Sequence, residues 1–241
     1  MRAPQGLIAD VVRFSWVDGP GNRFVVFLQG CNLNCLVCHN PHTIARATPR
    51  ARAVGAAELV DQVRQHARSL SGVTVSGGEP TVQAPFVRAF FAALAEADGL
   101  PRLTRFVDSN GAATPQVWRS LLPLTDAVML DLKALDPAVH RYLTGQDNTQ
   151  VLRSIRQVAA SGKLHEVRLV LVPGVNADPA TLRATTRWLL DVDPDMRIKV
   201  IGFRRHGVRA AARLWPEPGP DQLDGYREQL RELGVRDLEV V

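Results

Sequence analysis

Three cysteines lie within eight residues of this sequence, in the pattern Cys31-Asn-Leu-Asn-Cys35-Leu-Val-Cys38, and the chain contains no other cysteine. Thiolates at this spacing can bind three corners of a cubane 4Fe-4S cluster, which ordinarily takes four cysteine ligands. The pattern therefore predicts one cluster, with an iron left open for a substrate. Gly30 directly precedes Cys31 and lets the chain turn sharply there.

Three other interpretations of this segment compete with the cluster. The three cysteines together with His39 form a zinc ligand set, although four ligands in nine residues are crowded for a closed tetrahedral site. Cys35-Leu-Val-Cys38-His39 matches a haem-attachment string, which leaves Cys31 unexplained. A redox C-x-x-C pair also leaves Cys31 unexplained. A disulfide framework is not expected, because the odd number of cysteines is confined to one loop.

Polar residues follow almost every apolar run of the chain. They are Gly77-Gly78-Glu79 after GVTVS, Asp108-Ser109 after RFV, Asp131-Leu-Lys133 after AVML, and Arg204-Arg205-His206 after RIKVIGF. Because the carboxyl ends of parallel strands meet at one edge of a sheet, the acidic residues 79, 108 and 131 and the basic residues 133, 168 and 204–206 are expected to converge. Such a set suits a zwitterionic ligand with separate ammonium and carboxylate groups.

Short β-branched runs alternate with longer segments of helical period, which is typical of βαβ units and a parallel sheet. We expect strands within residues 23–29, 72–76, 105–109, 127–132, 166–172, 197–203 and 238–241. The predicted fold class is α/β, a partial (β/α)6 barrel with parallel strands, in a single domain over 1–241. Prolines 115, 137 and 179, each preceded by Thr or Asp, mark helix starts. The Ala- and Arg-rich segment 45–56 is expected to be an exposed loop.

The formal net charge is +5, but the basic residues are scattered and no aromatic-interleaved basic stripe occurs. A solvated surface therefore explains the charge better than nucleic-acid binding. No apolar run approaches the roughly 20 residues of a membrane-spanning helix, and the N-terminus lacks the regions of a signal peptide. We expect a cytoplasmic protein with no membrane or nucleic-acid partner.

Taken together, these motifs resemble those of a known family. C-x3-C-x2-C followed by Gly-Gly-Glu is similar to the radical S-adenosylmethionine (SAM) superfamily. Within it, the motifs resemble the glycyl-radical-enzyme activating enzymes, the pyruvate formate-lyase activase-like group. The motifs are Trp-Val-Asp-Gly-Pro-Gly-Asn-Arg (16–23), Cys-His-Asn (38–40), Asp-Ser-Asn-Gly (108–111) and Met-Leu-Asp-Leu-Lys (129–133). The chain looks closest to the YjjW-type branch, without that branch's ferredoxin-like insert.

The resemblance implies one 4Fe-4S cluster on Cys31, Cys35 and Cys38, and SAM bound at its open iron. It implies the following further roles. The methionine ammonium is held by Gly77, Gly78 and Glu79, and the carboxylate or the ribose faces Lys133, Arg168, Arg204 and His206. The adenine meets the backbone from Val37 to His39. A monovalent cation is ligated by Asp108, Ser109, Met129 and Asp131. Lys133 is counted with the three cysteines as catalytic. Asp18 is implied to contact the substrate.

The implied activity is that of an anaerobic oxidoreductase. It cleaves SAM reductively to a 5′-deoxyadenosyl radical, which abstracts hydrogen from a glycine of a partner glycyl-radical enzyme, of the YjjI type by the branch likeness. Three cysteines leave none for an accessory cluster, so the electron must come from an external reductant such as flavodoxin or ferredoxin. We expect a monomer. Two alternatives remain at this point: a radical SAM enzyme acting on a small molecule, and a metal-binding or electron-transfer protein that is not an enzyme.

Overall fold

The chain, seen in a computed structural model that describes residues 4–100 and 102–241, forms two compact units. The first comprises the described residues of 1–32, 42–109 and 113–129, and the second comprises 33–41, 110–112 and 130–241. Strand β6 (Ala127–Asp131) begins in the first unit and ends in the second. Cys31 belongs to the first unit, and Cys35 and Cys38 belong to the second. The single domain expected over 1–241 stays a prediction, because the two units interleave along the chain.

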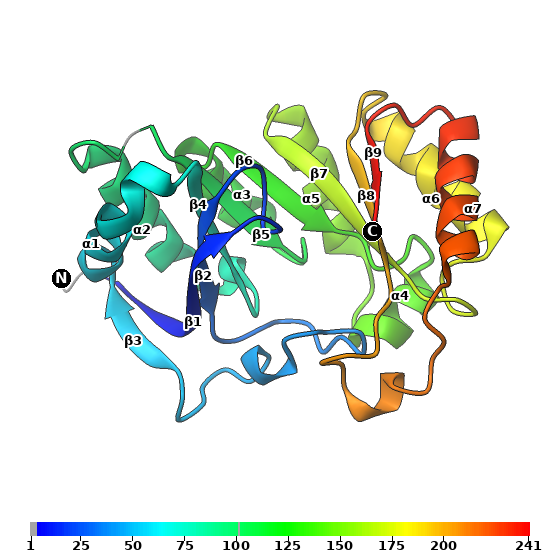
Figure 1. Cartoon of the computed structure of the whole chain (residues 1–241), viewed down its shortest axis with the longest axis horizontal. Helices are drawn as coiled ribbons and strands as arrows, with labels where there is room; N and C mark the ends of the chain where they lie inside the picture. Colours follow the sequence, from blue (N-terminus) through cyan, green and yellow to red (C-terminus); the bar gives the residue numbers. More distant parts are fainter. Residues whose placement is uncertain (1–3, 101) are drawn as a thin grey trace. The chain divides into compact units, whose positions relative to one another are not determined.

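The first unit is a sheet covered by helices (Figure 1). Its strands follow the order β3-β1-β2-β4-β5, in which β1 is antiparallel to β2 and β3, whereas β2, β4 and β5 are parallel. The strands are β1 (Gln5–Ser15), β2 (Arg23–Leu28), β3 (Arg52–Gly55), β4 (Gly72–Gly77) and β5 (Thr104–Ser109). The helices are α1 (Ala56–His66), α2 (Ala84–Glu96) and α3 (Pro115–Leu121), with 3-10 turns η1 (Pro41–Thr43), η2 (Ala67–Ser69), η3 (Pro80–Gln83) and η4 (Leu122–Leu124).

The second unit repeats the strand–helix alternation. Strands β7, β8 and β9 are parallel neighbours in that order. The elements are α4 (Pro137–Thr144), α5 (Thr149–Ala160), β7 (Leu164–Leu171), α6 (Pro179–Val192), β8 (Ile198–Gly202), η5 (Ala210–Ala212), α7 (Pro220–Glu232) and β9 (Leu238–Val240). Helix α5 packs against β7, and α7 packs against α6 and β9 (Figure 1).

The expected strands and helix starts are confirmed. Each of the seven apolar runs contains a strand, and α3, α4 and α6 begin at prolines 115, 137 and 179. Asp136 and Asp178 accept hydrogen bonds from the first backbone N–H groups of their helices, which a cap must satisfy. These aspartates therefore fix where α4 and α6 begin.

Two strands were not predicted, β1 and β3, and the second of them corrects the expected loop over 45–56. Arg52–Gly55 pairs with β1, from Gln5 opposite Gly55 to Ile8 opposite Arg52. Only Val54 of β3 is buried. Backbone pairing holds this edge strand, and such pairing leaves no apolar pattern in the sequence.

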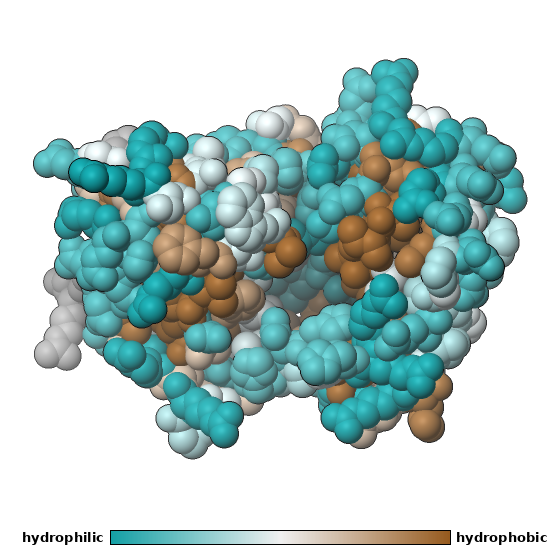
Figure 2. Space-filling model, in the orientation of Figure 1, coloured by the Kyte–Doolittle hydropathy of each residue, from teal (hydrophilic) through white to brown (hydrophobic). Residues whose placement is uncertain are grey.

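Apolar side chains fill the interior of both units. Leu59 and Val63 of α1 are buried, as are Phe86 and Phe90 of α2, whose rings stack. On the face shown in Figure 2, hydrophilic side chains predominate, and apolar ones gather over β1 and β2 in the first unit and over β8 in the second. No helix in the described part of the chain is long and apolar enough to cross a membrane.

Candidate functional site

The first ligand cysteine and the Gly-Gly-Glu turn are joined by backbone hydrogen bonds in the first unit. Glu79 N donates to Gly30 O at 2.8 Å, and Gly78 N donates to Leu28 O at 2.7 Å. Gly30 has a φ of +98°, which only glycine adopts readily. Cys31 N donates to Ile44 O at 3.0 Å. The carboxyl ends of β2 and β4 therefore present Cys31 and Glu79 together.

The two glycines of this turn are required by the chain's own backbone. A Cβ on Gly78 would lie 2.2 Å from Gly30 O and 2.7 Å from Thr43 O. A Cβ on Gly77 would lie 2.1 Å from Leu28 N, and Gly77 also has a φ of +119°. These approaches give the Gly-Gly pair a structural reason that is separate from its predicted contact with a ligand. That contact stays a prediction.

Glu79 is fully buried, and its carboxylate is fixed by donors from its own unit. Oε1 accepts from Thr81 N at 2.9 Å, from Thr81 Oγ1 at 2.7 Å and from Ser109 Oγ at 2.8 Å. Buried carboxylates need such partners, because an unsatisfied one is costly. The structure thus brings together Glu79 and Ser109, two residues that the sequence assigned to different ligands.

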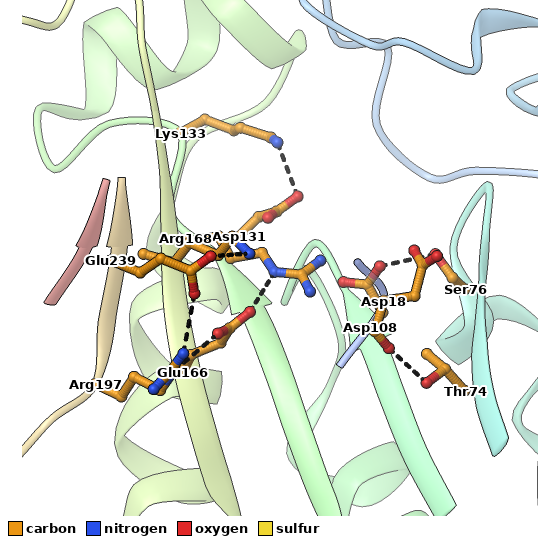
Figure 3. A network of polar contacts seen from close by, with 11 residues as sticks. Asp18, Thr74, Ser76, Asp108, Asp131, Lys133, Glu166, Arg168, Arg197 and Glu239 are labelled. Carbon is orange, nitrogen blue, oxygen red and sulfur yellow. Dashed lines mark hydrogen bonds and ion pairs between the residues drawn. The ribbon is translucent and has the colours of Figure 1, made fainter. Parts of the chain in front are cut away.

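Asp18 and Asp108 are each held by a neighbouring hydroxyl (Figure 3). Ser76 Oγ donates to Asp108 Oδ2 at 2.8 Å, and Ser15 Oγ donates to Asp18 Oδ2 at 2.5 Å. Thr74 Oγ1 donates to the backbone oxygen of Asp18 at 2.7 Å. The loop between β1 and β2 is therefore tied to β4, and Asp18 is partly buried on it.

Arg23 anchors this loop from inside the sheet. It is fully buried, and its Nε donates to Thr74 Oγ1 at 2.6 Å while Nη1 donates to Pro20 O at 3.3 Å. The guanidinium also lies 4.1 Å from the centroid of the Phe106 ring and donates to both oxygens of Thr104. Burial lowers the pKa of Arg23 to about 10, and the charges of Asp126 and Asp18 oppose that shift. Arg23 is a positioning residue for Asp18.

In the second unit, Lys133 and Asp131 accompany the other two cysteines. Lys133 Nζ lies 2.8 Å from Asp131 Oδ2 (Figure 3), and only 13% of the lysine side chain is exposed. Burial raises the pKa of the Cys35 thiol to about 11, and the positive charge of Lys133 acts in the opposite direction. Burial also raises the pKa of Cys38. Burial lowers the pKa of Lys133, but Asp131 and the two cysteines more than offset this, so the net pKa is raised.

The cysteine loop rests on α4 and on the chain after β8. Asn34 N donates to Thr144 O and Leu36 N donates to Leu143 O, each at 2.8 Å. Arg209 Nη1 donates to the backbone and side-chain oxygens of Asn34, at 3.0 and 2.6 Å. Val37 is 3% exposed and packs in a core cluster. Its side chain is thus committed to packing, which leaves its backbone for the predicted adenine contact.

The segment 204–207 lies against His39. The distance from His39 Nε2 to Arg204 O is 3.2 Å, and a Cβ on Gly207 would lie 3.1 Å from His39 O. The Arg204 guanidinium lies 3.5 Å from Glu217, and the His206 side chain is exposed. Burial lowers the pKa of His39, and Lys133 and His206 act in the same direction.

Arg168 belongs to an ion-pair network along β7, β8 and β9 (Figure 3). Its Nε lies 2.6 Å from Glu166 Oε1, and Arg197 Nε lies 3.3 Å from Glu166 Oε2. Arg197 also pairs with Asp237 and Glu239. Glu166 and Arg168 are two residues apart on β7 and therefore share a face. Glu166 orients the Arg168 side chain.

Several of these supporting residues carry no signal in the sequence. Thr81 and Glu166 lie only two residues from their partners Glu79 and Arg168, but neither residue type at that spacing marks a site by itself. His140 is fully buried in α4 with its Nδ1 2.9 Å from Gln146 O, and Asn148 Nδ2 donates to Leu135 O at 2.6 Å. His140 therefore supports the C-terminal end of α4, on which the cysteine loop rests, and Asn148 ties the chain after α4 to Leu135, which precedes the helix. Arg23 was named in the sequence analysis only as the last residue of the 16–23 motif, without a role of its own.

The donor set is suited to an iron–sulfur cluster. All three cysteines are free thiols, and Lys133 supplies a positive charge near two of them. Among the residues that the structure describes, no three His, Cys, Asp or Glu side chains converge on a single metal ion. A cubane does not require such convergence, because each thiolate binds a different iron. The chemistry of the donor set, three free thiols within eight residues, therefore fits a three-cysteine cluster.

Comparison with known sequences gives consistent matches. Residues 25–184 match the model of the radical SAM superfamily. The chain is 37% identical to the pyruvate formate-lyase-activating enzyme of Streptococcus mutans over 92% of this chain and 85% of the relative. It is 34% identical to the enzyme of that name from Staphylococcus aureus strain USA300, over 85% of this chain and 83% of the relative.

Solved structures share the fold. A domain of pyruvate-formate lyase-activating enzyme from Bacteroides vulgatus has a TM-score of 0.58 at 22% identity, over 71% of this chain and 99% of that one. Coproporphyrinogen III oxidase (HemN) from Escherichia coli, a radical SAM enzyme, has a TM-score of 0.60 at 16% identity, over 87% of this chain and 51% of that one. These likenesses confirm the predicted fold class, the partial barrel of radical SAM enzymes.

Proposed function

Because the chain belongs to the radical SAM superfamily and, within it, to the family of the pyruvate formate-lyase-activating enzymes, we propose that it activates a glycyl-radical enzyme. It does so by removing one hydrogen atom from a glycine of that partner. One observation carries the proposal: a relative named pyruvate formate-lyase-activating enzyme is 37% identical to this chain over 92% of its length. A small-molecule substrate is the alternative that the cluster motif alone would allow.

Members of this superfamily use a 4Fe-4S cluster and SAM. Cys31, Cys35 and Cys38 would hold the cluster. Bound there and reduced, it would supply the one electron that splits SAM into methionine and a 5′-deoxyadenosyl radical. That radical attacks most C–H bonds, so the protein must exclude water and position the correct glycine. The cofactor supplies the chemistry, and the chain supplies the geometry.

We assign the SAM contacts from the family likeness. Lys133 would meet the SAM carboxylate: its side chain is largely buried, and the charge is maintained by Asp131. Arg168 would present a guanidinium oriented by Glu166. Of the 204–206 segment, His206 is the better candidate for the carboxylate, since the Arg204 side chain already lies beside Glu217. The backbone of Val37 and His39 would meet the adenine.

By the same likeness, Glu79 would hold the methionine ammonium together with Gly77 and Gly78. Thr81 and Ser109 donate to its Oε1 and fix the orientation of its carboxylate. Asp108, Ser109, Met129 and Asp131 are the candidate ligands of a monovalent cation, by family likeness. Met129 is fully buried, so its backbone oxygen would be the ligand.

By the family likeness, Asp18 would contact the partner's glycine loop. It is partly buried on a loop that Arg23 and Thr74 fix in place. The partner would be of the YjjI type, by likeness to the YjjW branch. An external flavodoxin or ferredoxin would supply the electron. The protein would act as a monomer in the cytoplasm.

The test is to follow the hydrogen atom. Reduced, reconstituted protein is mixed with SAM and a candidate partner whose glycine is α-deuterated, and 5′-deoxyadenosine is analysed by mass spectrometry. Deuterium should appear in 5′-deoxyadenosine, and should be absent when the partner's glycine is replaced by alanine. Deuterium-free 5′-deoxyadenosine from both partners would instead support a small-molecule substrate.

A second arm tests Asp18. Asp18→Ala should reduce deuterium transfer at least tenfold while SAM cleavage without the partner stays unchanged. Asp10→Ala is the matched control, because Asp10 is an exposed carboxylate on the preceding strand β1. Equal effects of the two substitutions would remove Asp18 from the partner contact.

A further inference from the structure

The stretch of chain that surrounds the first ligand cysteine carries no negative charge. No Asp or Glu occurs from Gly19 to Ala57. Arg46, Arg50 and Arg52 of this stretch are all exposed. Arg52 lies 3.7 Å from Glu58, and within the described part of the chain neither Arg46 nor Arg50 forms an ion pair. This exposed segment, residues 46–52 with three arginines and no acidic residue, is defined here as the Arg46 surface.

A pocket of about 460 Å³ in the first unit is lined by both Cys31 and Arg46. Arg46 is the only charged residue among those lining it, and Leu7 and Val82 supply apolar side chains. Val82 is 46% exposed. The pocket therefore combines apolar walls with one cationic side, next to a residue that binds the cluster.

Arg46 is held close to Cys31 by the backbone. A Cβ on Gly30 would lie 3.6 Å from the Cα of Arg46. Gly30 N donates to Thr43 O at 2.8 Å and Cys31 N donates to Ile44 O at 3.0 Å, so the segment before Arg46 is bonded to the residues that lead into the cluster loop. The charge and the ligand thus occupy fixed neighbouring positions.

We propose that an acidic one-electron carrier protein docks on the Arg46 surface and delivers its electron to the cluster on the side of Cys31. The inference rests on the proposed function, which requires an external electron. Transient redox complexes bury small interfaces and depend on complementary charge for fast encounter. A carrier with an acidic surface complements the three arginines, and the apolar pocket supplies the centre of the contact. The carrier loses one electron, and the cluster gains it; no proton or bond change is involved.

The test uses the anaerobically reconstituted protein and an acidic flavodoxin reduced to its hydroquinone. Cluster reduction is followed by stopped-flow absorbance at low salt. The triple variant R46Q/R50Q/R52Q should slow the bimolecular step about tenfold or more, in the range of electrostatic steering. R153Q/R183Q/R187Q is the matched control, since it removes three exposed arginines from α5 and α6. The control should stay within about twofold of the wild type, and high salt should abolish the difference by screening.

A small reductant and a second variant separate the possible outcomes. Dithionite should reduce the cluster of every variant equally, which shows that the cluster itself is intact. Val82→Glu should also slow the flavodoxin reaction, by adding repulsion without removing an arginine. The proposal would be overturned if the two triple variants slowed cluster reduction by flavodoxin equally, or if R46Q/R50Q/R52Q did not slow it. Equal inhibition of the flavodoxin reaction by heparin in wild type and R46Q/R50Q/R52Q would also overturn it. If flavodoxin reduced the cluster at the normal rate but no SAM were cleaved, the proposed function would be refuted, whereas the docking site would not.

Discussion

Gly78→Ala is expected to destabilise the protein at the point where the Gly-Gly-Glu turn meets the cysteine loop. The new Cβ would lie 2.2 Å from Gly30 O, so the Gly30 carbonyl must move by roughly an ångström to reach normal contact distance. That shift breaks or weakens two hydrogen bonds, from Glu79 N to Gly30 O and from Gly30 N to Thr43 O. Each is worth about 1 kcal/mol, and more when a buried donor is left unpaired. The expected loss is roughly 2 to 4 kcal/mol in the free energy of unfolding.

The assay is urea unfolding of the apoprotein, followed by circular dichroism under reducing conditions. With a slope of about 3 kcal/mol/M, the midpoint should fall by roughly 1 M. Gly225→Ala is the matched control, because Gly225 is exposed inside α7 and its Cβ would meet nothing within 4 Å. It should stabilise by about 0.5 to 1 kcal/mol, as alanine is the better helix former. A Gly78→Ala midpoint equal to that of the wild type would refute the close-approach argument.

Two further predictions concern the second unit. In the apoprotein at pH 8, alkylation of Cys35 by iodoacetamide should be roughly 100-fold slower than for an ordinary thiol, because burial raises its pKa to about 11 and only the thiolate reacts. The alkylation rate should rise with pH up to about 11, and Lys133→Met should lower the rate further at pH 8. Peptide mass spectrometry measures both rates. A plateau near pH 9 would contradict the raised pKa of Cys35. Asp136→Ala should cost about 1 kcal/mol, because the side chain accepts from Ala138 N and Val139 N at the start of α4. Asp136→Asn should retain most of that stability in urea unfolding, because an amide oxygen can accept the same hydrogen bonds. Equal losses of stability in Asp136→Ala and Asp136→Asn would show that the charge matters and not the capping hydrogen bonds.

The sequence predicted those parts of the structure that leave a local pattern. Apolar runs located every strand from β2 to β9 except β3, and Thr or Asp before proline located three helices. Asp136 and Asp178 cap their helices through the side chain, whereas Thr114 makes no such hydrogen bond. Strand β3 carried no such pattern, because it is held by pairing with β1 and buries only Val54. Pairing between distant backbones depends on the fold, so no local rule reports it.

The candidate site shows the same division. Glu79, Asp108 and Asp131 were singled out because they follow apolar runs of the sequence. Their partners Thr81, Ser76 and Lys133 were not equally recognisable. Lys133 belonged to a motif, but a threonine or serine hydroxyl is common and becomes informative only when its acceptor is known. From the sequence, the Gly-Gly pair was predicted to contact a ligand. The structure adds a second reason for both glycines, because a Cβ at either position would clash with the backbone of Leu28 or Gly30.

The loop that carries Asp18 is ordered by folding and does not need a partner to fix it. Arg23 donates to Pro20 O, Thr74 donates to Asp18 O, and Asn22 Nδ2 donates to Ser69 O at 2.7 Å. Ordering a loop during association subtracts from binding free energy, so a loop that is already fixed binds more tightly for the same contacts. The buried Arg23 charge is costly to desolvate, and its five hydrogen bonds and the Phe106 ring offset that cost. A buried cation in this position is therefore explained by what it holds in place, the backbone on either side of Asp18.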